Sequence, residues 1–229
     1  MKSLGNFPDP FLGEIARQPE ALRRAATALL EQRSALEEIR EAGTTAHTVV
    51  FTGMGSSYDA CYPAVNDLAG RGVPSLQVDT AELLHFRRPI LGPQTLLIIL
   101  SQSGESAEIV KLVAELTKQR ARPTVVSITN GLDNDLAKRA EITLDTRVGK
   151  ETGPSTMTFA AAMAQLSGIA RLVAGDGVDT AIDRTQTAAE GAAQAVERLL
   201  DDPEASAAEL AEFLGEYPSL SAEIVASVG

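Results

Sequence analysis

Ten residues, "LSQSGESAEI" from Leu100 to Ile109, place three serines and one glycine between an apolar run and a helical pattern. The N-terminus of a helix binds phosphate well, because free backbone N–H groups and the helix dipole both attract an anion. Serine hydroxyls add hydrogen bonds to phosphate or sugar oxygens without adding charge. This stretch is therefore a candidate binding loop for a phosphorylated ligand. Its candidate residues are Ser101, Gln102, Ser103 and Ser106.

A second junction, "TGMGSSYDA", has similar chemistry. Gly53 and Gly55 end an apolar run there, and Ser56 and Ser57 open a helical pattern. In open parallel sheets ligands bind beyond the carboxyl ends of the strands, where the strand order reverses. A single serine at a helix start is also an ordinary N-cap, so each junction alone leaves capping and binding open. Two such junctions on one sheet favour a binding site.

Other chemistries lack their motifs. "GMGSSY" has no third glycine of the dinucleotide fingerprint, and no complete phosphate-loop pattern occurs. "SQSGE" is not a nucleophile elbow, because a glycine flanks the serine on one side only. His47 and His85 have no ligand-like spacing, and the single cysteine, Cys61, excludes an internal disulfide and a cysteine-built metal site. We expect neither a metal nor a cofactor.

The surrounding elements alternate between strands and helices. Apolar strands are predicted at 48–55, 74–78, 94–100, 122–129 and 141–146, and helices at 56–70, 79–86, 105–120, 132–140 and 156–175. This pattern predicts an α/β fold with a parallel sheet covered by helices on both faces. We expect one domain over 1–229: a helical lead-in at 14–43 that Gly43 closes, a core at 47–175, and two or three C-terminal helices within 177–229. Pro19 is expected in the first turn of the lead-in helix.

The charge balance limits the class of partner. Thirty-one acidic and twenty basic residues give a net charge of −11. Nucleic acids and anionic membranes need a basic face, so neither is an expected partner, and an anionic ligand must be held by local groups. The apolar stretches fall short of the ~20 residues of a membrane span, and the first residues lack a signal-peptide core. We expect a soluble, cytoplasmic protein.

Four motifs, "GMGSSY", "SQSGESAEIV", "ITNGLDNDLAKRAEITLDT" and "GKETGPSTMTFAAAMAQL", occur in this order. Together they resemble the first sugar-isomerase (SIS) domain of the glucosamine-6-phosphate synthase family, from about Glu14 to Val173. The resemblance implies a three-layer sandwich with a five-stranded parallel sheet of flavodoxin-like type. It also implies a homodimer and a sugar phosphate ligand, such as fructose-6-phosphate or glucosamine-6-phosphate.

The family's ligand-binding positions carry over to three segments of this chain. The residues that the resemblance implies for sugar phosphate binding are Gly55, Ser56, Ser57, Ser101, Gln102, Ser103, Ser106, Pro154 and Ser155. Two departures stand out: Met157 occupies a position where the family usually has lysine, and the preceding loop is one residue shorter. Glu151 in this loop is a candidate general base. The alternatives are a solvated charge of the loop or an anion that stabilises the start of the next helix.

Three functions follow from these expectations. The first is the initial SIS half of a sugar-phosphate isomerase or aminotransferase-like enzyme, whose catalytic Glu, Lys and His belong to a second SIS domain in the family. The second is a non-catalytic module that senses a sugar phosphate and regulates a partner. The third is a complete isomerase, which the absence of an evident acid–base set argues against. No glutaminase domain with a leading cysteine precedes the SIS-like segment in this chain.

Overall fold

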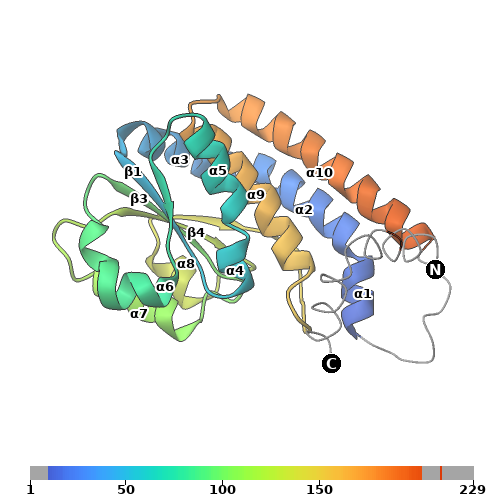
Figure 1. The fold of residues 1–229 in the computed structure, drawn as a ribbon, viewed down its shortest axis with the longest axis horizontal. Helices are drawn as coiled ribbons and strands as arrows, with labels where there is room; N and C mark the ends of the chain where they lie inside the picture. The colour runs from blue at the N-terminus through green and yellow to red at the C-terminus, as the bar shows by residue number, and fades with distance from the viewer. Residues whose placement is uncertain (1–9, 203–211, 213–229) are drawn as a thin grey trace.

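The structure, a computed structural model, describes residues 10–202 and Glu212 (Figure 1). Its centre is a parallel sheet of five strands in the order β2-β1-β3-β4-β5. The strands are β1 (Thr48–Thr52), β2 (Ser75–Gln77), β3 (Thr95–Leu100), β4 (Thr124–Thr129) and β5 (Ile142–Asp145). This order is of the flavodoxin-like type, in which the direction of winding reverses between β1 and β3. The predicted α/β class and five-stranded parallel sheet are confirmed.

Both faces of the sheet are apolar, because successive side chains of a strand point to opposite sides. Val49 and Phe51 belong to one buried cluster, whereas Val50 belongs to the other. The first cluster lies under α3 (Arg33–Thr45), α5 (Tyr62–Gly70) and α9 (Met157–Val173). The second lies under α6 (Thr80–Glu82), η1 (Leu83–Arg87), α7 (Ala107–Leu116) and α8 (Asp135–Arg139), with the short turn η2 (Arg88–Ile90) nearby. The three-layer sandwich therefore agrees with the expectation.

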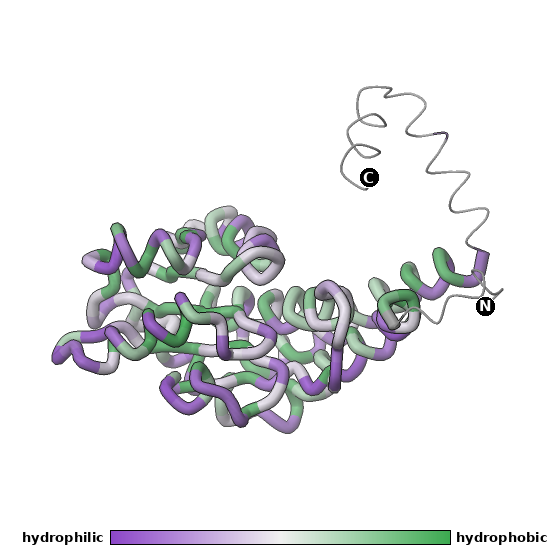
Figure 2. Tube along the Cα trace, turned by 90° about the horizontal axis from the view of Figure 1, so that it is seen from below, coloured by the Kyte–Doolittle hydropathy of each residue, from purple (hydrophilic) through white to green (hydrophobic). Residues whose placement is uncertain are grey.

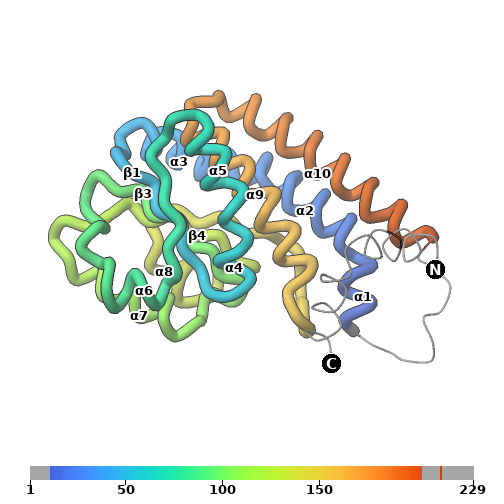
Figure 3. The backbone as a smooth tube through the Cα atoms, in the orientation of Figure 1, coloured from blue at the N-terminus to red at the C-terminus, as the bar shows by residue number. Residues whose placement is uncertain are grey.

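Three further helices extend one side of the sandwich. α1 (Pro10–Ala16) leads into α2 (Gln18–Glu31), which runs beside α9 and α10 (Val178–Asp201), as Figure 3 shows. Leu22 and Ala26 of α2 pack against Ala189 and Ala193 of α10. Hydrophilic and hydrophobic residues alternate along these helices in Figure 2, as expected for helices with one buried face. None of the helices in the described ranges is long and apolar enough to cross a membrane.

The lead-in differs from the single helix that the sequence predicts. It consists of α1, α2 and α3, and the break at Gln32 turns that residue's side chain toward the end of β5. Pro19 lies in the first turn of α2, as predicted. Gly43 does not close the helix: α3 continues to Thr45, and a Cβ at Gly43 would lie 3.0 Å from Cα of Val173. This glycine therefore allows the close approach of α3 and α9.

One other helix prediction needs correction, and one is tested only over its first part. The helix predicted over 56–70 is divided into α4 (Ser56–Asp59) and α5, and Pro63 lies in the first turn of α5, where its missing N–H costs no hydrogen bond. The two or three helices predicted within 177–229 begin as one long helix, α10. The rest of that prediction, apart from Glu212, lies outside the described residues.

Adjacent leucines on α2 test whether this helix is part of the core. Leu29 is 1% exposed and belongs to the cluster above β1 and β3, whereas Leu30 is 50% exposed. We expect Leu29→Ala to lower the free energy of unfolding by about 2–5 kcal/mol, because it leaves a cavity. Leu30→Ala should change it by less than about 0.5 kcal/mol. Urea denaturation of both variants measures the difference, and equal losses would contradict the packing of α2.

Candidate ligand site at the carboxyl edge of the sheet

The turn after β1 brings the start of α4 close to the strand. A Cβ at Gly53 would lie 2.8 Å from the backbone of Ser57 and Tyr58, so a larger residue does not fit there. Gly55 has φ +54°, a left-handed conformation that glycine adopts at little cost. The Tyr58 carbonyl accepts a hydrogen bond of 2.7 Å from Nε2 of Gln77, which ties the turn to β2. Ser56 is exposed and Ser57 is half-buried at this edge.

The loop after β3 continues the pairing of β3 with β4. The Ser101 N–H donates to the Ile128 carbonyl at 3.1 Å, and the Asn130 N–H donates to the Gln102 carbonyl at 3.0 Å. Oγ of Ser101 accepts from the Gly104 N–H at 3.1 Å, and Oγ of Ser103 accepts from the Glu105 N–H at 3.2 Å. A hydroxyl that accepts a hydrogen bond still carries a proton to donate. These two serines therefore shape the loop and can also bind an anion.

Ser106 occupies the N-cap position of α7, yet its side chain makes no capping hydrogen bond. Ordinary capping would aim that hydroxyl at the N–H groups of the first turn. Because Ser106 is not used in this way, the capping alternative does not account for it. The ten-residue helix α7 points the positive end of its dipole at the Ser101–Ser106 loop.

Gly104 packs against the start of α8 and holds the loop there. It has φ +65°, and a Cβ there would lie 1.9 Å from Oδ1 of Asn134. The Gly104 carbonyl accepts a hydrogen bond of 3.1 Å from the Leu136 N–H, and Asn134 caps α8 by accepting from the Ala137 N–H at 2.8 Å. The shape of the loop is thus fixed by a helix that begins thirty residues later in the chain.

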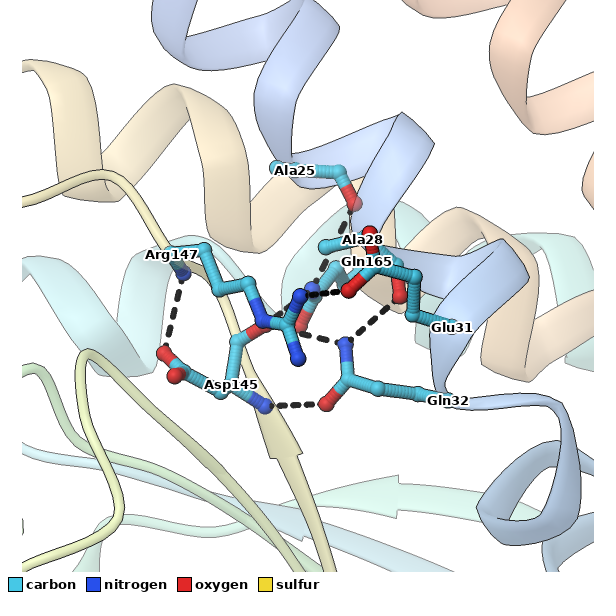
Figure 4. A network of polar contacts seen from close by, with 7 residues as sticks. All are labelled: Ala25, Ala28, Glu31, Gln32, Asp145, Arg147 and Gln165. Carbon is cyan, nitrogen blue, oxygen red and sulfur yellow. Dashed lines mark hydrogen bonds and ion pairs between the residues drawn. The ribbon is translucent and has the colours of Figure 1, made fainter.

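A third segment reaches the site from the end of β5. The backbone of Asp145, the last residue of β5, makes two hydrogen bonds with the side chain of Gln32 (Figure 4). Its carbonyl accepts from Nε2 of Gln32 at 3.1 Å, and its N–H donates to Oε1 of Gln32 at 2.7 Å. Gln165 of α9 donates to the same Asp145 carbonyl at 3.0 Å. Arg147 then turns the chain with φ +54°, and its side chain pairs with Glu31 of α2. The helical layer therefore sets the direction in which residues 146–156 leave the sheet.

Glu151 lies at the start of α9. Its Oε1 accepts from the N–H groups of Thr156 and Met157 at 2.8 and 2.7 Å, and its Oε2 accepts from the Thr158 hydroxyl. These contacts correspond to the helix-start anion, one of the roles considered for this residue. Met157 is 1% exposed and packs among apolar residues of α2 and α9. The position where the family usually has lysine is therefore buried between helices.

These three segments surround one small pocket, whose interior of about 10 Å³ has room for about one water molecule and which opens to solvent at its mouth. Its lining residues are Ser57, Ala60, Leu100, Gln102, Ile128, Thr129, Asn130, Thr146, Ser155, Thr158, Phe159 and Ala162. No side chain in this set is charged. The polar groups are hydroxyls and two amides, which suit the hydroxyl groups of a sugar.

The structure brings part of the predicted set into this pocket. Ser57, Gln102 and Ser155 line it. Ser101, Ser103 and Ser106 belong to the adjoining loop and the start of α7. Ser56 and Pro154 are chain neighbours of lining residues, and Gly55 precedes Ser56. Three further lining residues, Thr129, Asn130 and Thr146, lie in none of the three predicted binding segments, although they end or follow β4 and β5. The same rule about carboxyl ends of strands could have found them.

Neither histidine of the chain lies at the pocket. His47 and His85 are exposed and do not line the pocket. Among the described residues no group of three or more His, Cys, Asp or Glu side chains could hold a metal ion. Burial raises the pKa of the Cys61 thiol to about 12, and this thiol donates to the Ser57 carbonyl. It is therefore a packed side chain beneath the site.

Fold and pocket together define an α/β protein with a pocket at the carboxyl edge of its sheet, near the switch in strand order. Residues 44–171 match the SIS domain family, and because this segment is more than half of the 229 residues, the chain belongs to that family. An arabinose 5-phosphate isomerase of Escherichia coli is 36% identical over 109 residues, which cover 48% of this chain and 34% of that protein.

Two further relatives connect the chain with the family that the motifs resemble. A glutamine–fructose-6-phosphate aminotransferase (isomerizing) of Pyrobaculum aerophilum is 28% identical over 170 residues, 74% of this chain and 27% of that protein. The C-terminal domain of glucosamine-fructose-6-phosphate aminotransferase from Francisella tularensis shares the fold with a TM-score of 0.71 and 23% identity, over 87% of this chain and 58% of that one. The matches span about a third or less of the two curated relatives.

Substitutions at two glycines with left-handed φ values test the contact between the Ser101–Ser106 loop and α8. Gly72 has φ +78° with open space around its Cβ position, whereas Gly104 has φ +65° and meets Asn134. Gly72→Ala should cost about 1–2 kcal/mol of stability, the ordinary penalty of this conformation. Gly104→Ala should cost more, because Asn134 must also leave its capping position. Thermal unfolding of both variants checks the order, and an equal loss would show that the contact with α8 is unimportant.

Proposed function

We propose that this chain binds a sugar phosphate at the carboxyl edge of its sheet. The phosphate lies against the Ser101–Ser106 loop and the N-terminus of α7, and the sugar lies over the mouth of the pocket that Ser57, Gln102 and Ser155 line. The observation that carries this proposal is Ser106, which stands at the N-cap of a ten-residue helix without capping it. Gln102 belongs to both the loop and the pocket, which supports one ligand across both.

The acidic composition supports binding by neutral groups. At a net charge of −11 the overall field repels an anion, so the helix dipole and hydrogen bonds must hold the phosphate. The pocket lining supplies hydroxyls and amides. Hydroxyls of this kind fit fructose-6-phosphate or glucosamine-6-phosphate, the ligands that the resemblance suggests, and the similarity to an arabinose 5-phosphate isomerase adds a pentose phosphate.

We further propose that the chain acts as the ligand-binding half of a sugar-phosphate isomerase or aminotransferase-like enzyme. Moving a proton between two sugar carbons requires a base, and the pocket lining includes no carboxylate or histidine. Glu151 is the candidate base from the sequence, and its oxygens accept hydrogen bonds from the start of α9. The base would therefore come from another SIS domain. The lack of a base in the pocket lining also favours a second candidate, a module that senses a sugar phosphate without turnover. The expected homodimer and cytoplasmic location stay predictions.

A thermal-shift screen tests the binding. Fructose-6-phosphate, glucosamine-6-phosphate and arabinose 5-phosphate are compared with the three free sugars. A ligand at a hundred times its Kd should stabilise the chain by about 2.7 kcal/mol. We expect stabilisation by at least one sugar phosphate and none by its free sugar. No shift with any of the three would contradict the proposed function. Proton NMR of the bound sugar phosphate then shows whether this chain alone interconverts aldose and ketose.

Substitution of Ser106, compared with substitution of a control serine, tests where the phosphate binds. Ser106→Ala should weaken sugar phosphate binding by about tenfold, the value of one hydrogen bond to a charged group. Its stability should be nearly unchanged, since the side chain makes no capping hydrogen bond. Ser34→Ala is the matched control, because Ser34 is an exposed residue of α3 outside the pocket lining. Isothermal titration of both variants measures the affinities, and an unchanged Kd for Ser106→Ala would return this serine to a structural role.

A further inference from the structure

A buried carboxylate of α1 accepts hydrogen bonds from the loop that carries Ser155. Glu14 is 1% exposed, although the first residues of a chain seldom bury a charge. Its Oε1 accepts hydrogen bonds from the Thr152 N–H at 2.6 Å and from the Thr152 hydroxyl at 2.9 Å. Its Oε2 accepts from the Gly153 N–H at 3.0 Å. Both oxygens of Glu14 thus bind one short stretch of loop, 138 and 139 positions further along the chain.

The contact is tight as well as polar. A Cβ at Gly153 would lie 2.9 Å from Oε2 of Glu14 and 3.3 Å from the ring of Phe11, so the loop backbone lies directly against α1. In Figure 1 α1 lies beside the lower end of α9, where this loop enters the helix. The hydrogen bond from the Thr152 backbone, with those of the Thr152 side chain and Gly153, holds the pKa of Glu14 below its usual range. The carboxylate is therefore charged at neutral pH.

Thr152 and Gly153, which bind Glu14, are close in the chain to the pocket. Gly153 is followed by Pro154, whose ring fixes its φ, and by Ser155, which lines the pocket. The Ser155 hydroxyl lies 2.8 Å from Oγ1 of Thr158, another lining residue. Because few bonds can rotate between Gly153 and Ser155, the position of Gly153 largely decides where Ser155 stands.

We infer that Glu14 is a positioning residue of the ligand site: from α1 it holds residues 152–155 in place at the pocket, and thereby sets the affinity for the sugar part of the ligand. The inference rests on the proposed function. It adds to the site a helix that lies outside the segment matched to the SIS domain, residues 44–171. A loop that is ordered in advance spares the ligand the cost of ordering it, so release of the loop weakens binding.

The test compares two carboxylates that accept backbone hydrogen bonds at opposite edges of the sheet. Glu14→Gln keeps the size of the side chain but replaces one acceptor by a donor facing N–H groups. The matched control is Glu141→Gln: Glu141 precedes β5 and accepts from the Val125 N–H at 2.9 Å, at the amino edge far from the pocket. Isothermal titration of the full chain uses the tightest of the three sugar phosphates named above, and inorganic phosphate.

We expect Glu14→Gln to weaken sugar phosphate binding by about tenfold, while the affinity for inorganic phosphate stays within about twofold of the unaltered chain. Glu141→Gln should bind both as the unaltered chain does. Hydrogen exchange at the Thr152 and Gly153 amides should accelerate in Glu14→Gln only. Gly153→Ala reaches the same contact from the loop side and should give the same split between the two ligands.

Each contrary result has a distinct meaning. Sugar phosphate affinity that is unchanged in Glu14→Gln, even with faster exchange, would overturn the positioning role. Equal losses for both ligands, or equal losses in the Glu141 control, would indicate general destabilisation and would also overturn it. If the unaltered chain binds none of the sugar phosphates, the proposed function itself fails, together with this inference.

Discussion

The arrangement of the site depends on the parallel hydrogen-bonded ladder around β3. This strand is buried on both faces and pairs with β1 on one side and β4 on the other. Its register with these strands therefore determines where their carboxyl ends lie relative to its own. The winding reverses between β1 and β3. Consequently two turns that are almost fifty residues apart in the chain open at the same edge, one on each side of the reversal. Ser57 of the first turn and Gln102 of the second therefore line one pocket, although no local sequence signal links the two turns.

Much of this arrangement could be predicted from the residues. The apolar run that ends at Leu100 and the glycines after β1 and β3 specify strands, turns and helix starts through local rules. What could not be predicted depends on partners distant in the chain. The break at Gln32 follows from its bonds to Asp145, and Gly43 serves a contact with Val173 rather than a helix end. Glu14 likewise gave no local sign that it would meet Thr152.

The chemistry of the site is mostly neutral, and its geometry comes from carboxylates and amides placed behind it. Glu151 stabilises the start of α9, and Glu14 and Gln32 anchor the loop between β5 and that helix. The charged groups therefore act on the backbone, while hydroxyls face the pocket. This division explains why a search for paired acids and bases finds little in the sequence. The character of the site lies in the positions of main-chain and hydroxyl groups, which depend on the fold.

The side chain of Gln32 has one more effect. β5 is the last strand of the sheet, and its outer edge would present unpaired backbone groups to the surroundings. At Asp145 the amide of Gln32 both accepts from the N–H and donates to the carbonyl, as a neighbouring strand would (Figure 4). The glutamine thus imitates one residue of a sixth strand. It ends the sheet at that point, and so blocks edge-to-edge association with another molecule there.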